Sequence, residues 1–243
     1  ILFNGVYFMA ESAKILNPAT KVLIADTHAS CSLVKGMSRE DLIELKGRYP
    51  NVPVVTYINS SADVKAESDV ICTSSNAHKI VESMDSEQVI FVPDQYLAAN
   101  VAQHTTKKII PFGASCRVHE QFTKEQILQQ REQVPDLVAL AHPECPVDVT
   151  EEADIVGSTA KMIQWAEGKV QGQQAMFLTE GSLVENVQAD HPEIRLHGPK
   201  IYCINMQLIT LEKVLAALQN EQYEVDLPED IRNAAYGSLK RML

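Results

Sequence analysis

Three cysteines recur at the same position of a repeated local pattern, and together they could hold an iron–sulfur cluster. The pattern is Cys-x6-[Ser/Thr]-x-Glu-x-[Leu/Ile/Val]-[Leu/Ile], and it begins at Cys31, Cys116 and Cys203, with spacings of 85 and 87 residues. Cysteine thiolates are the usual ligands of such clusters, and three of them would leave one iron of a [4Fe–4S] cluster open. A structural zinc site would more often show a C-x2-C knuckle, which this sequence lacks. The alternative is three small buried apolar side chains.

Polar pairs follow two equivalent apolar runs, VPVVTYIN and LVALAHPE, and they could transfer protons. The first pair is Tyr57 and Asn59, and the second is His142 and Glu144. Side chains at positions i and i+2 of a strand point to the same side, so each pair would face the cavity that holds the thiolates. Tyr and His can exchange protons, whereas Asn and Glu can bind amide, imine or hydroxyl groups. Ordinary loop hydrogen bonding is the alternative for both pairs.

A third matched feature is a group of hydroxyl residues between a strand and a helix. Thr73-Ser74-Ser75 in one copy corresponds to Ser158-Thr159 in the next. Hydroxyls and free backbone N–H groups at a helix N-terminus can bind an anion, although helix capping alone would also explain these residues. The remaining histidines have no supporting constellation and are expected in loops or at the surface: His28, His78, His104, His119, His191 and His197.

The repeat extends well beyond these residues and indicates duplicated structural units. Residues 31–74 align with 116–159 without a gap, and VIFVPDQYLAANV then parallels AMFLTEGSLVENV. In this alignment Cys72 and Cys145 have no cysteine at the equivalent positions, so we do not assign them to the cluster. At the chain start, ILFNGVYFMAESAKIL is aligned with DVICTSSNAHKIVESM of the second half of a unit.

The Cys203 copy contains only the beginning of a unit, so we expect the two chain ends to share one domain. The predicted division is residues 1–22 with 199–243, then 23–107, then 108–198. The middle of the shared domain would lie upstream of Ile1, so the chain is expected to lack an N-terminal segment.

Apolar runs alternate with helical patterns along the whole chain, which predicts an α/β fold with parallel sheets covered on both faces. The expected strands are KVLIAD, PVVTYI, DVICT, QVIFVP, KIIPF, LVALA, ADIVG, AMFLT and KIYCI. Ser38 with Asp41, and Thr123 with Gln126, predict capping boxes at two helix starts. The third copy has Lys213 at that place, so its box is incomplete.

The composition of the chain disfavours some classes of binding partner and favours one type of cysteine chemistry. The formal net charge of −11 disfavours nucleic acid and anionic membrane surfaces. No apolar run approaches the length of a membrane span, and no signal-peptide pattern occurs. Five cysteines in such an acidic chain favour reduced thiols in the cytoplasm, and therefore metal binding or catalysis.

With these residues in place, the chain resembles the quinolinate synthase family, the iron–sulfur enzymes of NAD biosynthesis. The resemblance runs essentially from end to end. It is carried by the strings FMAESAKILNP, HASCSL, TYINSSADVKAESDVICTSSNA, GASCRVHEQF, AHPEC, GSTAKMI, FLTEGSLV and CINMQLITLEKVL. It implies three similar αβα three-layer domains around a pseudo-threefold axis, with a [4Fe–4S] cluster at the centre held by Cys31, Cys116 and Cys203.

The resemblance also implies a reaction and roles for individual residues. Family members condense iminoaspartate with dihydroxyacetone phosphate to quinolinate, with loss of phosphate and two waters, and a functional link to L-aspartate oxidase is expected. Catalysis would involve Tyr57, His142 and Glu144, and the substrate-site residues would be Tyr57, Asn59, Ser74, His142, Glu144 and Thr159. The family also has an N-terminal His-Asn-Tyr-type segment, which this sequence does not show. The competing hypotheses are another [4Fe–4S] hydro-lyase and a non-catalytic iron–sulfur carrier or sensor.

Overall fold

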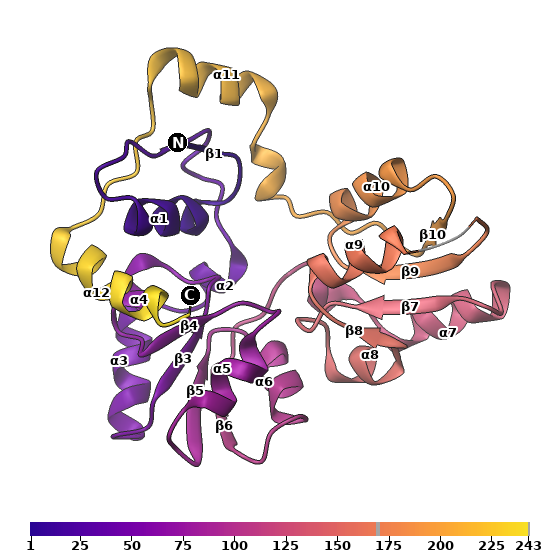
Figure 1. Cartoon of the computed structure of the whole chain (residues 1–243), viewed down its shortest axis with the longest axis horizontal. Coiled ribbons are helices and arrows are strands. Elements are labelled where there is room, and N and C mark those ends of the chain that lie inside the picture. The colour runs from indigo at the N-terminus through magenta and orange to yellow at the C-terminus, as the bar shows by residue number, and fades with distance from the viewer. Residues whose placement is uncertain (169–170, 243) are drawn as a thin grey trace.

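The computed structural model of the chain describes residues 1–168 and 171–242 and contains three parallel β-sheets (Figure 1). One sheet has two strands, in the order β1-β2. The other two have four strands each, in the orders β4-β3-β5-β6 and β10-β9-β7-β8. All pairings between strands are parallel, so the predicted α/β class is confirmed.

The strands and helices alternate along most of the chain. The strands are β1 (Leu2–Phe3), β2 (Leu23–Ile24), β3 (Val54–Tyr57), β4 (Val70–Cys72), β5 (Gln88–Val92), β6 (Lys108–Pro111), β7 (Val138–Ala141), β8 (Ile155–Val156), β9 (Gln174–Leu178) and β10 (Arg195–His197). The helices are α1 (Tyr7–Leu16), α2 (Ser32–Lys35), α3 (Arg39–Arg48), α4 (Ala62–Ala66), α5 (Ala77–Ser83), α6 (Gln95–Ala102), α7 (Lys124–Gln133), α8 (Val147–Glu152), α9 (Thr159–Glu167), α10 (Gly181–Asp190), α11 (Leu211–Asn220) and α12 (Glu229–Lys240). Two 3₁₀ turns are η1 (His119–Gln121) and η2 (Met206–Leu208).

Each four-stranded sheet is covered by helices on both faces. Consecutive residues of a strand point to opposite faces of the sheet, so neighbouring residues belong to different cores. In β3, Val55 belongs to a core with residues of α5 and α6, whereas Val54 belongs to a core with residues of α3 and α4. In β9, Met176 faces α7 and α8, whereas Phe177 faces α9 and α10. Both strands are therefore continuous apolar runs, as is usual for parallel sheets buried on two faces. This is the αβα layering that was predicted.

The two four-stranded sheets have the same topology, as the internal repeat requires. The strands β4, β3, β5 and β6 of one correspond in order to β8, β7, β9 and β10 of the other. A hydrogen bond from the central strand to an aspartate recurs as well. The Asp69 carboxylate accepts the Val54 N–H at 2.7 Å, and the equivalent Asp154 accepts the Ala139 N–H at 2.8 Å. Both units therefore hold their central strand in the same way.

The alignment of the chain start was wrong, although its assignment to the second half of a unit was right. β1 pairs with β2, which leads to Cys31, in the way that β5 pairs with β6, which leads to Cys116. The segment ILFNGVYFMAESA therefore corresponds to VIFVPDQYLAANV. DVICT, with which it was aligned, forms an edge strand instead.

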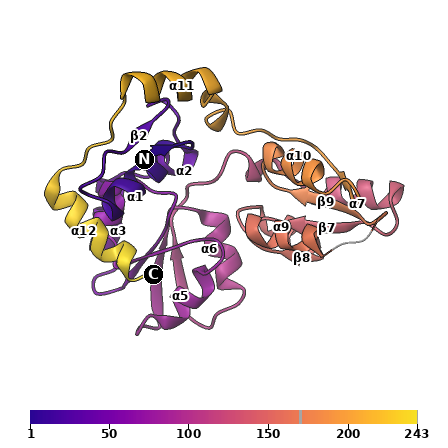
Figure 2. The same ribbon diagram turned by 45° about the horizontal axis from the view of Figure 1, so that its top comes forward.

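The two ends of the chain pack together, as Figures 1 and 2 both show. α11 contacts both β1 and β2, and α12 contacts α1. Val225 donates its N–H to the Val22 carbonyl at 2.8 Å, which adds the C-terminal segment to β2. α12 also packs on α4 and β4 of the neighbouring sheet. The domain boundaries at residues 22, 107 and 198 stay a prediction.

The predicted strand KIYCI, which contains the third cysteine, Cys203, is wrong. The position beside β9 is taken by the earlier segment Arg195–His197, in register with residues 174–176. Gly198 then turns the chain with a φ of 99°, in the left-handed region that favours glycine. The KIYC segment runs past the end of the sheet, where Ile201 forms a single parallel bridge with Glu180.

The helix starts agree with the sequence. Ser38 with Asp41 and Thr123 with Gln126 form complete capping boxes, whereas Thr210 accepts the Lys213 N–H without a reciprocal bond. Among the described residues, no helix combines the length and the apolar character that crossing a membrane requires.

Candidate functional site

Cys31 and Cys116 lie side by side, although 85 residues separate them in the sequence. The hydroxyl of Ser32, next to Cys31, donates to the Ser115 carbonyl at 2.9 Å and accepts the Arg117 N–H at 3.1 Å. One side chain therefore bonds the backbone on both sides of Cys116. A thiolate at Cys31 would lie near enough to disfavour a second one at Cys116.

Cys203 belongs to the same cluster of thiols. Cys116 and Cys203 pack against the same apolar core, and Cys203 is near enough to Cys31 to disfavour the Cys31 thiolate slightly. Burial raises the pKa of Cys31 to about 12, because it disfavours the thiolate, although the backbone N–H groups of Leu33 and Val34 bond the sulfur. All three cysteines are half-buried and none forms a disulfide.

Tyr57 and Glu144, which come from different sheets, meet in a buried hydrogen bond. The Tyr57 hydroxyl, at the end of β3, donates to Glu144 Oε1 at 2.6 Å. Glu144 follows β7, so the carboxyl ends of two sheets face one another here. The residues are 5% and 3% exposed, so water does not compete freely for this bond.

Two histidines complete the network around Glu144. His119 Nδ1 is 3.1 Å from Glu144 Oε2, and His119 Nε2 is 3.0 Å from the Thr179 hydroxyl. Because an ionised carboxylate can only accept, His119 Nδ1 carries the proton. His142 accepts the Glu144 N–H on Nδ1 at 3.3 Å, and its ring stacks on that of His119 with centroids 4.4 Å apart.

The electrostatics assign protonation states near neutral pH to three members of the network: Tyr57, His142 and Glu144. Burial and the neighbouring Glu144 carboxylate raise the pKa of Tyr57 well above its usual value. Burial, and then His119, lowers the pKa of His142 to about 3, so this imidazole is neutral. Burial alone would raise the pKa of Glu144, but the two histidines and the hydrogen bonds of His119 and Tyr57 hold it below its usual range. The site therefore combines a neutral phenol, a neutral imidazole and a carboxylate.

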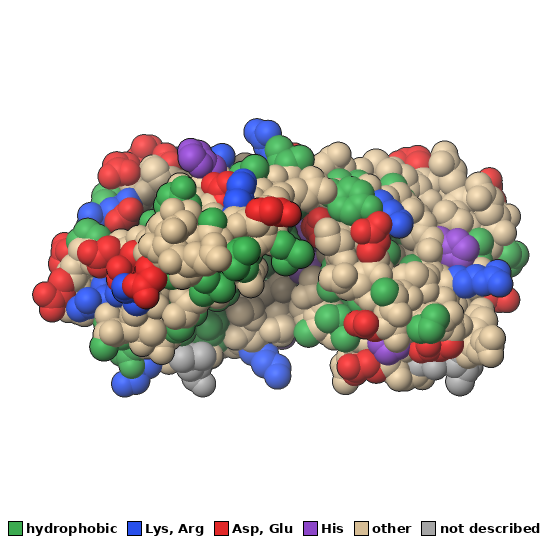
Figure 3. Space-filling view, turned by 90° about the horizontal axis from the view of Figure 1, so that it is seen from above, with side chains coloured by type: hydrophobic (Ala, Val, Ile, Leu, Met, Phe, Trp, Pro, Cys, Tyr) green, Lys and Arg blue, Asp and Glu red, His purple; other side chains and the backbone are tan. Residues whose placement is uncertain are grey.

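The network adjoins the cysteines. Cys116 Sγ, a His119 ring nitrogen and a Glu144 oxygen all lie within 4.8 Å of one another. The structure thus brings together the thiols and the Tyr57, His142 and Glu144 side chains predicted to work with them. Figure 3 shows the molecule hollowed between the part that carries both chain ends and the part around β7–β10, with a histidine side chain visible in the hollow.

Asn59, Ser74 and Thr159 lie near this edge but outside the hydrogen-bonded network. Asn59 and Ser74 each come two residues after neighbouring strands, β3 and β4, in which Tyr57 pairs with Cys72. Thr159 is the first residue of α9, and its side chain is exposed. Within the described ranges, these three side chains form no hydrogen bond with other residues, so their predicted roles stay predictions.

Cys72 and Cys145 lie inside the sheet cores. They are 0% and 1% exposed, and the Cys145 thiol donates to the Leu178 carbonyl at 3.4 Å. Their exclusion from the predicted cluster agrees with this burial.

Sequence reasoning missed His119, which was grouped with surface and loop histidines. The ring is buried at the centre of the site, three residues after Cys116 on η1. The repeat could not reveal it, because Val34 and Met206 occupy the equivalent positions. The Cys-x2-His spacing was the available signal. Thr179, which binds His119 and is 1% exposed, was missed as well.

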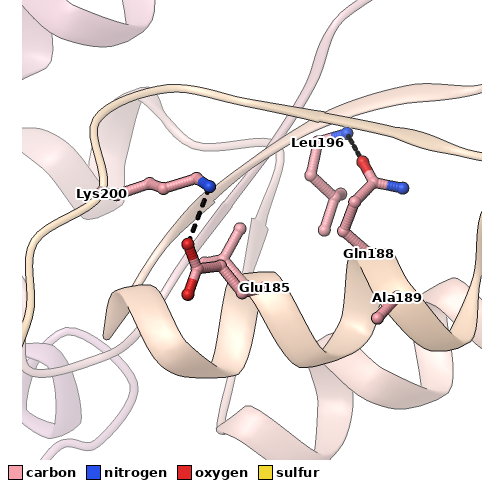
Figure 4. A pocket seen from close by; sticks show the side chains of 6 residues that line it. Glu185, Gln188, Ala189, Leu196 and Lys200 are labelled. Atoms are coloured by element: carbon pink, nitrogen blue, oxygen red, sulfur yellow. Dashed lines mark hydrogen bonds and ion pairs between the residues drawn. The ribbon is translucent and has the colours of Figure 1, made fainter.

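A second hollow lies along α10, outside this network (Figure 4). It is lined by Val184, Glu185, Gln188, Ala189, Leu196 and Lys200. Its polar groups are already engaged, since Lys200 pairs with Glu185 at 2.9 Å and Gln188 accepts the Leu196 N–H at 2.8 Å. We therefore place the chemistry at the thiols and not here.

Comparison with known proteins gives one answer along the whole chain. The family model described as "Quinolinate synthetase A protein" matches residues 1–243. The chain is 47% identical over 243 residues to quinolinate synthase 2 of Mesorhizobium japonicum, covering all of this chain and 75% of that protein. It is 44% identical to the quinolinate synthases of Agrobacterium fabrum and Xylella fastidiosa, again over its full length and over 70% and 71% of theirs. The chain belongs to the quinolinate synthetase A protein family.

Proposed function

We propose that this protein is a [4Fe–4S]-dependent quinolinate synthase of NAD biosynthesis. It would condense iminoaspartate with dihydroxyacetone phosphate and release phosphate and two waters. The observation that carries the proposal is the buried Tyr57–Glu144–His119 network directly beside Cys116. The network offers proton-transfer groups and the cysteines offer thiolates, and this dehydrating condensation needs both.

The donor set fits an iron–sulfur cluster. Cys31, Cys116 and Cys203 would hold it, since Ser32 bonds the backbone on both sides of Cys116, Cys116 and Cys203 pack against the same core, and none of the three forms a disulfide. Backbone N–H groups near two of the sulfurs, those of Leu33 and Val34 at Cys31 and those of Val118 and His119 at Cys116, favour the thiolate forms. Such N–H groups stabilise thiolates and tune clusters. When bound, the cluster supplies a Lewis-acidic iron that polarises a substrate oxygen.

Tyr57 is our candidate for the proton donor. Its raised pKa keeps the proton on the phenol oxygen at neutral pH. In the structure this proton is directed at Glu144 Oε1, so the hydroxyl would have to turn toward a substrate oxygen before it donates. A leaving hydroxyl or phosphate oxygen close to this phenol would receive the proton, and the ionised Glu144 would stabilise the positive charge that develops on a nearby imine nitrogen.

His142 and His119 differ in what they can do. His142 accepts the Glu144 N–H on Nδ1, so its neutral ring carries the proton on Nε2. It would orient a substrate oxygen and exchange a proton with it. His119 has a partner on each nitrogen, Glu144 and Thr179, and therefore acts by holding Glu144 in place.

Asn59, Ser74 and Thr159 would bind the substrates. The Asn59 amide is half-buried near the end of β3, where it could bind an imine or a carboxylate. Ser74 and Thr159 lie at the starts of α5 and α9, where backbone N–H groups favour phosphate or carboxylate oxygens. Because iminoaspartate must be supplied by oxidation of aspartate, an L-aspartate oxidase is the expected functional partner, in the cytoplasm.

An iron–sulfur carrier or sensor would be expected to use four protein ligands. The two other cysteines are buried in sheet cores, and His119 is bonded at both nitrogens. These contacts favour a site with three protein ligands and an enzyme over a carrier. Another hydro-lyase would share the open iron, and substrate tests separate it from the proposed enzyme.

The test is the reaction itself, with iron measured in the same samples. The anaerobically reconstituted protein should hold about four irons per chain and form quinolinate only when both substrates are present. Cys31→Ser, Cys116→Ser and Cys203→Ser should lose the cluster, whereas Cys72→Ser and Cys145→Ser should keep it. A loaded protein that forms no quinolinate would refute the activity. Cluster loss in Cys145→Ser together with retention in Cys116→Ser would refute the ligand assignment.

A further inference from the structure

The carboxylate of Glu180 performs two tasks at the start of α10. One oxygen, Oε2, accepts the N–H groups of Ser182 at 2.8 Å and Leu183 at 3.3 Å, which caps the helix. The other, Oε1, accepts the backbone N–H of Cys203 at 3.0 Å. A cap needs only the first set of bonds. The second bond ties the helix to a cysteine 23 residues further along the chain.

The segment that leads to Cys203 contacts the first part of α10, from Gly181 to Glu185, at each step. Gly181 donates its N–H to the Ile201 carbonyl at 2.8 Å. The Tyr202 ring packs so closely on Gly181 that an added Cβ would lie 2.9 Å from a ring carbon. Lys200 and the Tyr202 hydroxyl both bond Glu185 Oε1, at 2.9 and 2.7 Å, the first of which is drawn in Figure 4. The bond from Cys203 to Glu180 is the last of this series and the one nearest the sulfur.

The equivalent unit repeats the helix cap and the backbone bridge of this arrangement. Asp94 caps α6 by accepting the Leu97 N–H at 2.7 Å, and Gln95 donates to the Ala114 carbonyl at 2.9 Å, two residues before Cys116. Oδ2 of Asp94 is buried, and among the described residues no group hydrogen-bonds to it. In the unit formed by the chain ends, Val6 stands at this position, although Tyr7 still donates to the Ala29 carbonyl at 2.7 Å. A carboxylate therefore recurs beside two cysteines without being needed for the backbone bridge.

We propose that Glu180 is a positioning residue that fixes the backbone of Cys203 so that its sulfur points at the cluster. The inference rests on the proposed function, because it takes Cys203 as a cluster ligand. A hydrogen bond to a charged acceptor is stronger than one between neutral groups, and it limits rotation of the Cys203 peptide. Groups that orient metal ligands typically change metal affinity by about 10–100-fold when they are removed.

The test separates this task from capping. Glu180→Ser keeps an N-cap oxygen for α10 but is too short to reach Cys203, so the protein should fold and unfold at close to the wild-type temperature. Iron release to a chelator should become about 10–100-fold faster, and the visible absorption of the cluster should decay with it. Ser38→Ala, which removes the cap of α3 seven residues after Cys31 but breaks no bond to a cysteine backbone, should leave iron release unchanged.

Hydrogen exchange supplies a second measurement that needs no variant and no cluster. In the wild-type apoprotein, the Cys203 amide should exchange more slowly than the amides of Tyr202 and Ile204, and Glu180→Ser should remove that protection. Wild-type iron retention in Glu180→Ser, or an unprotected Cys203 amide, would overturn the role of Glu180 alone. A wild-type protein that binds no iron would instead overturn the proposed function, and this inference with it.

Discussion

Removing the Tyr57 hydroxyl by Tyr57→Phe separates chemistry from stability at this site. The phenol is 5% exposed and donates a 2.6 Å bond to a buried carboxylate. Losing one hydrogen bond to a charged partner costs about 2 kcal/mol, which for a chain of this size lowers Tm by about 4–8 °C. Turnover should fall by roughly 10²-fold or more, because a group that transfers protons is lost, while iron content stays normal.

The control is Thr56→Val, on the same strand. The Thr56 hydroxyl is fully buried and is 2.6 Å from the Ser68 hydroxyl, which is a bond between neutral groups. This change should cost about 1 kcal/mol and leave turnover nearly unchanged. The assays are thermal unfolding, iron analysis and quinolinate formation under anaerobic conditions. Near-normal turnover in loaded Tyr57→Phe protein would refute the proton-donor role, and loss of iron in that variant would show that the effect is structural.

Two further predictions concern contacts outside the proton-transfer network. Ser32→Ala removes both bonds to the backbone around Cys116, so iron release to a chelator should become several-fold faster. An unchanged rate of iron release would show that this contact does not hold the two cysteines together. Glu67 is paired with Arg39 and Lys46, and the hydrogen bond from Arg39 is the main cause that lowers its pKa below 4.5. Between the folded and unfolded pKa values of Glu67 the unfolded chain binds more protons, so the free energy of unfolding falls as the pH drops below about 4.5. Glu67→Gln should make this fall less steep when thermal unfolding is measured at a series of acid pH values. The same pH dependence of Tm in the variant and the wild type would contradict the assignment.

Periodicity and the internal repeat were sufficient to predict the fold class, because parallel strands buried on both faces are short apolar runs with recognisable spacing. Eight of the nine expected strands lie at or within the predicted segments. The KIYC segment was misassigned because Ile201 packs against the core of β7 and β9, while its backbone bonds the start of α10 and not a neighbouring strand. Apolar character signals burial, and it does not distinguish these two kinds of contact.

The site was predicted as far as the repeat reached. Tyr57, His142 and Glu144 were identified from matched strand ends, and the structure brings them together. His119 has no counterpart in the other units, and its role depends on Thr179, 60 residues away, and on Glu144, 25 residues away. A residue without a counterpart in the other units leaves no periodic trace in the sequence, so the repeat could not reveal these contacts, and the Cys-x2-His spacing was the only local signal for His119.

The packing of both chain ends has a consequence for how the protein is made. Cys203 emerges from the ribosome about 9–34 s after Cys31, at the usual synthesis rate of 5–20 residues per second. α12, which follows Cys203 in the chain, docks on α4 and β4, which are synthesised much earlier. Iron can therefore be captured by all three cysteines only after Cys203 has been synthesised, and the packing of α12 on β4 forms later still.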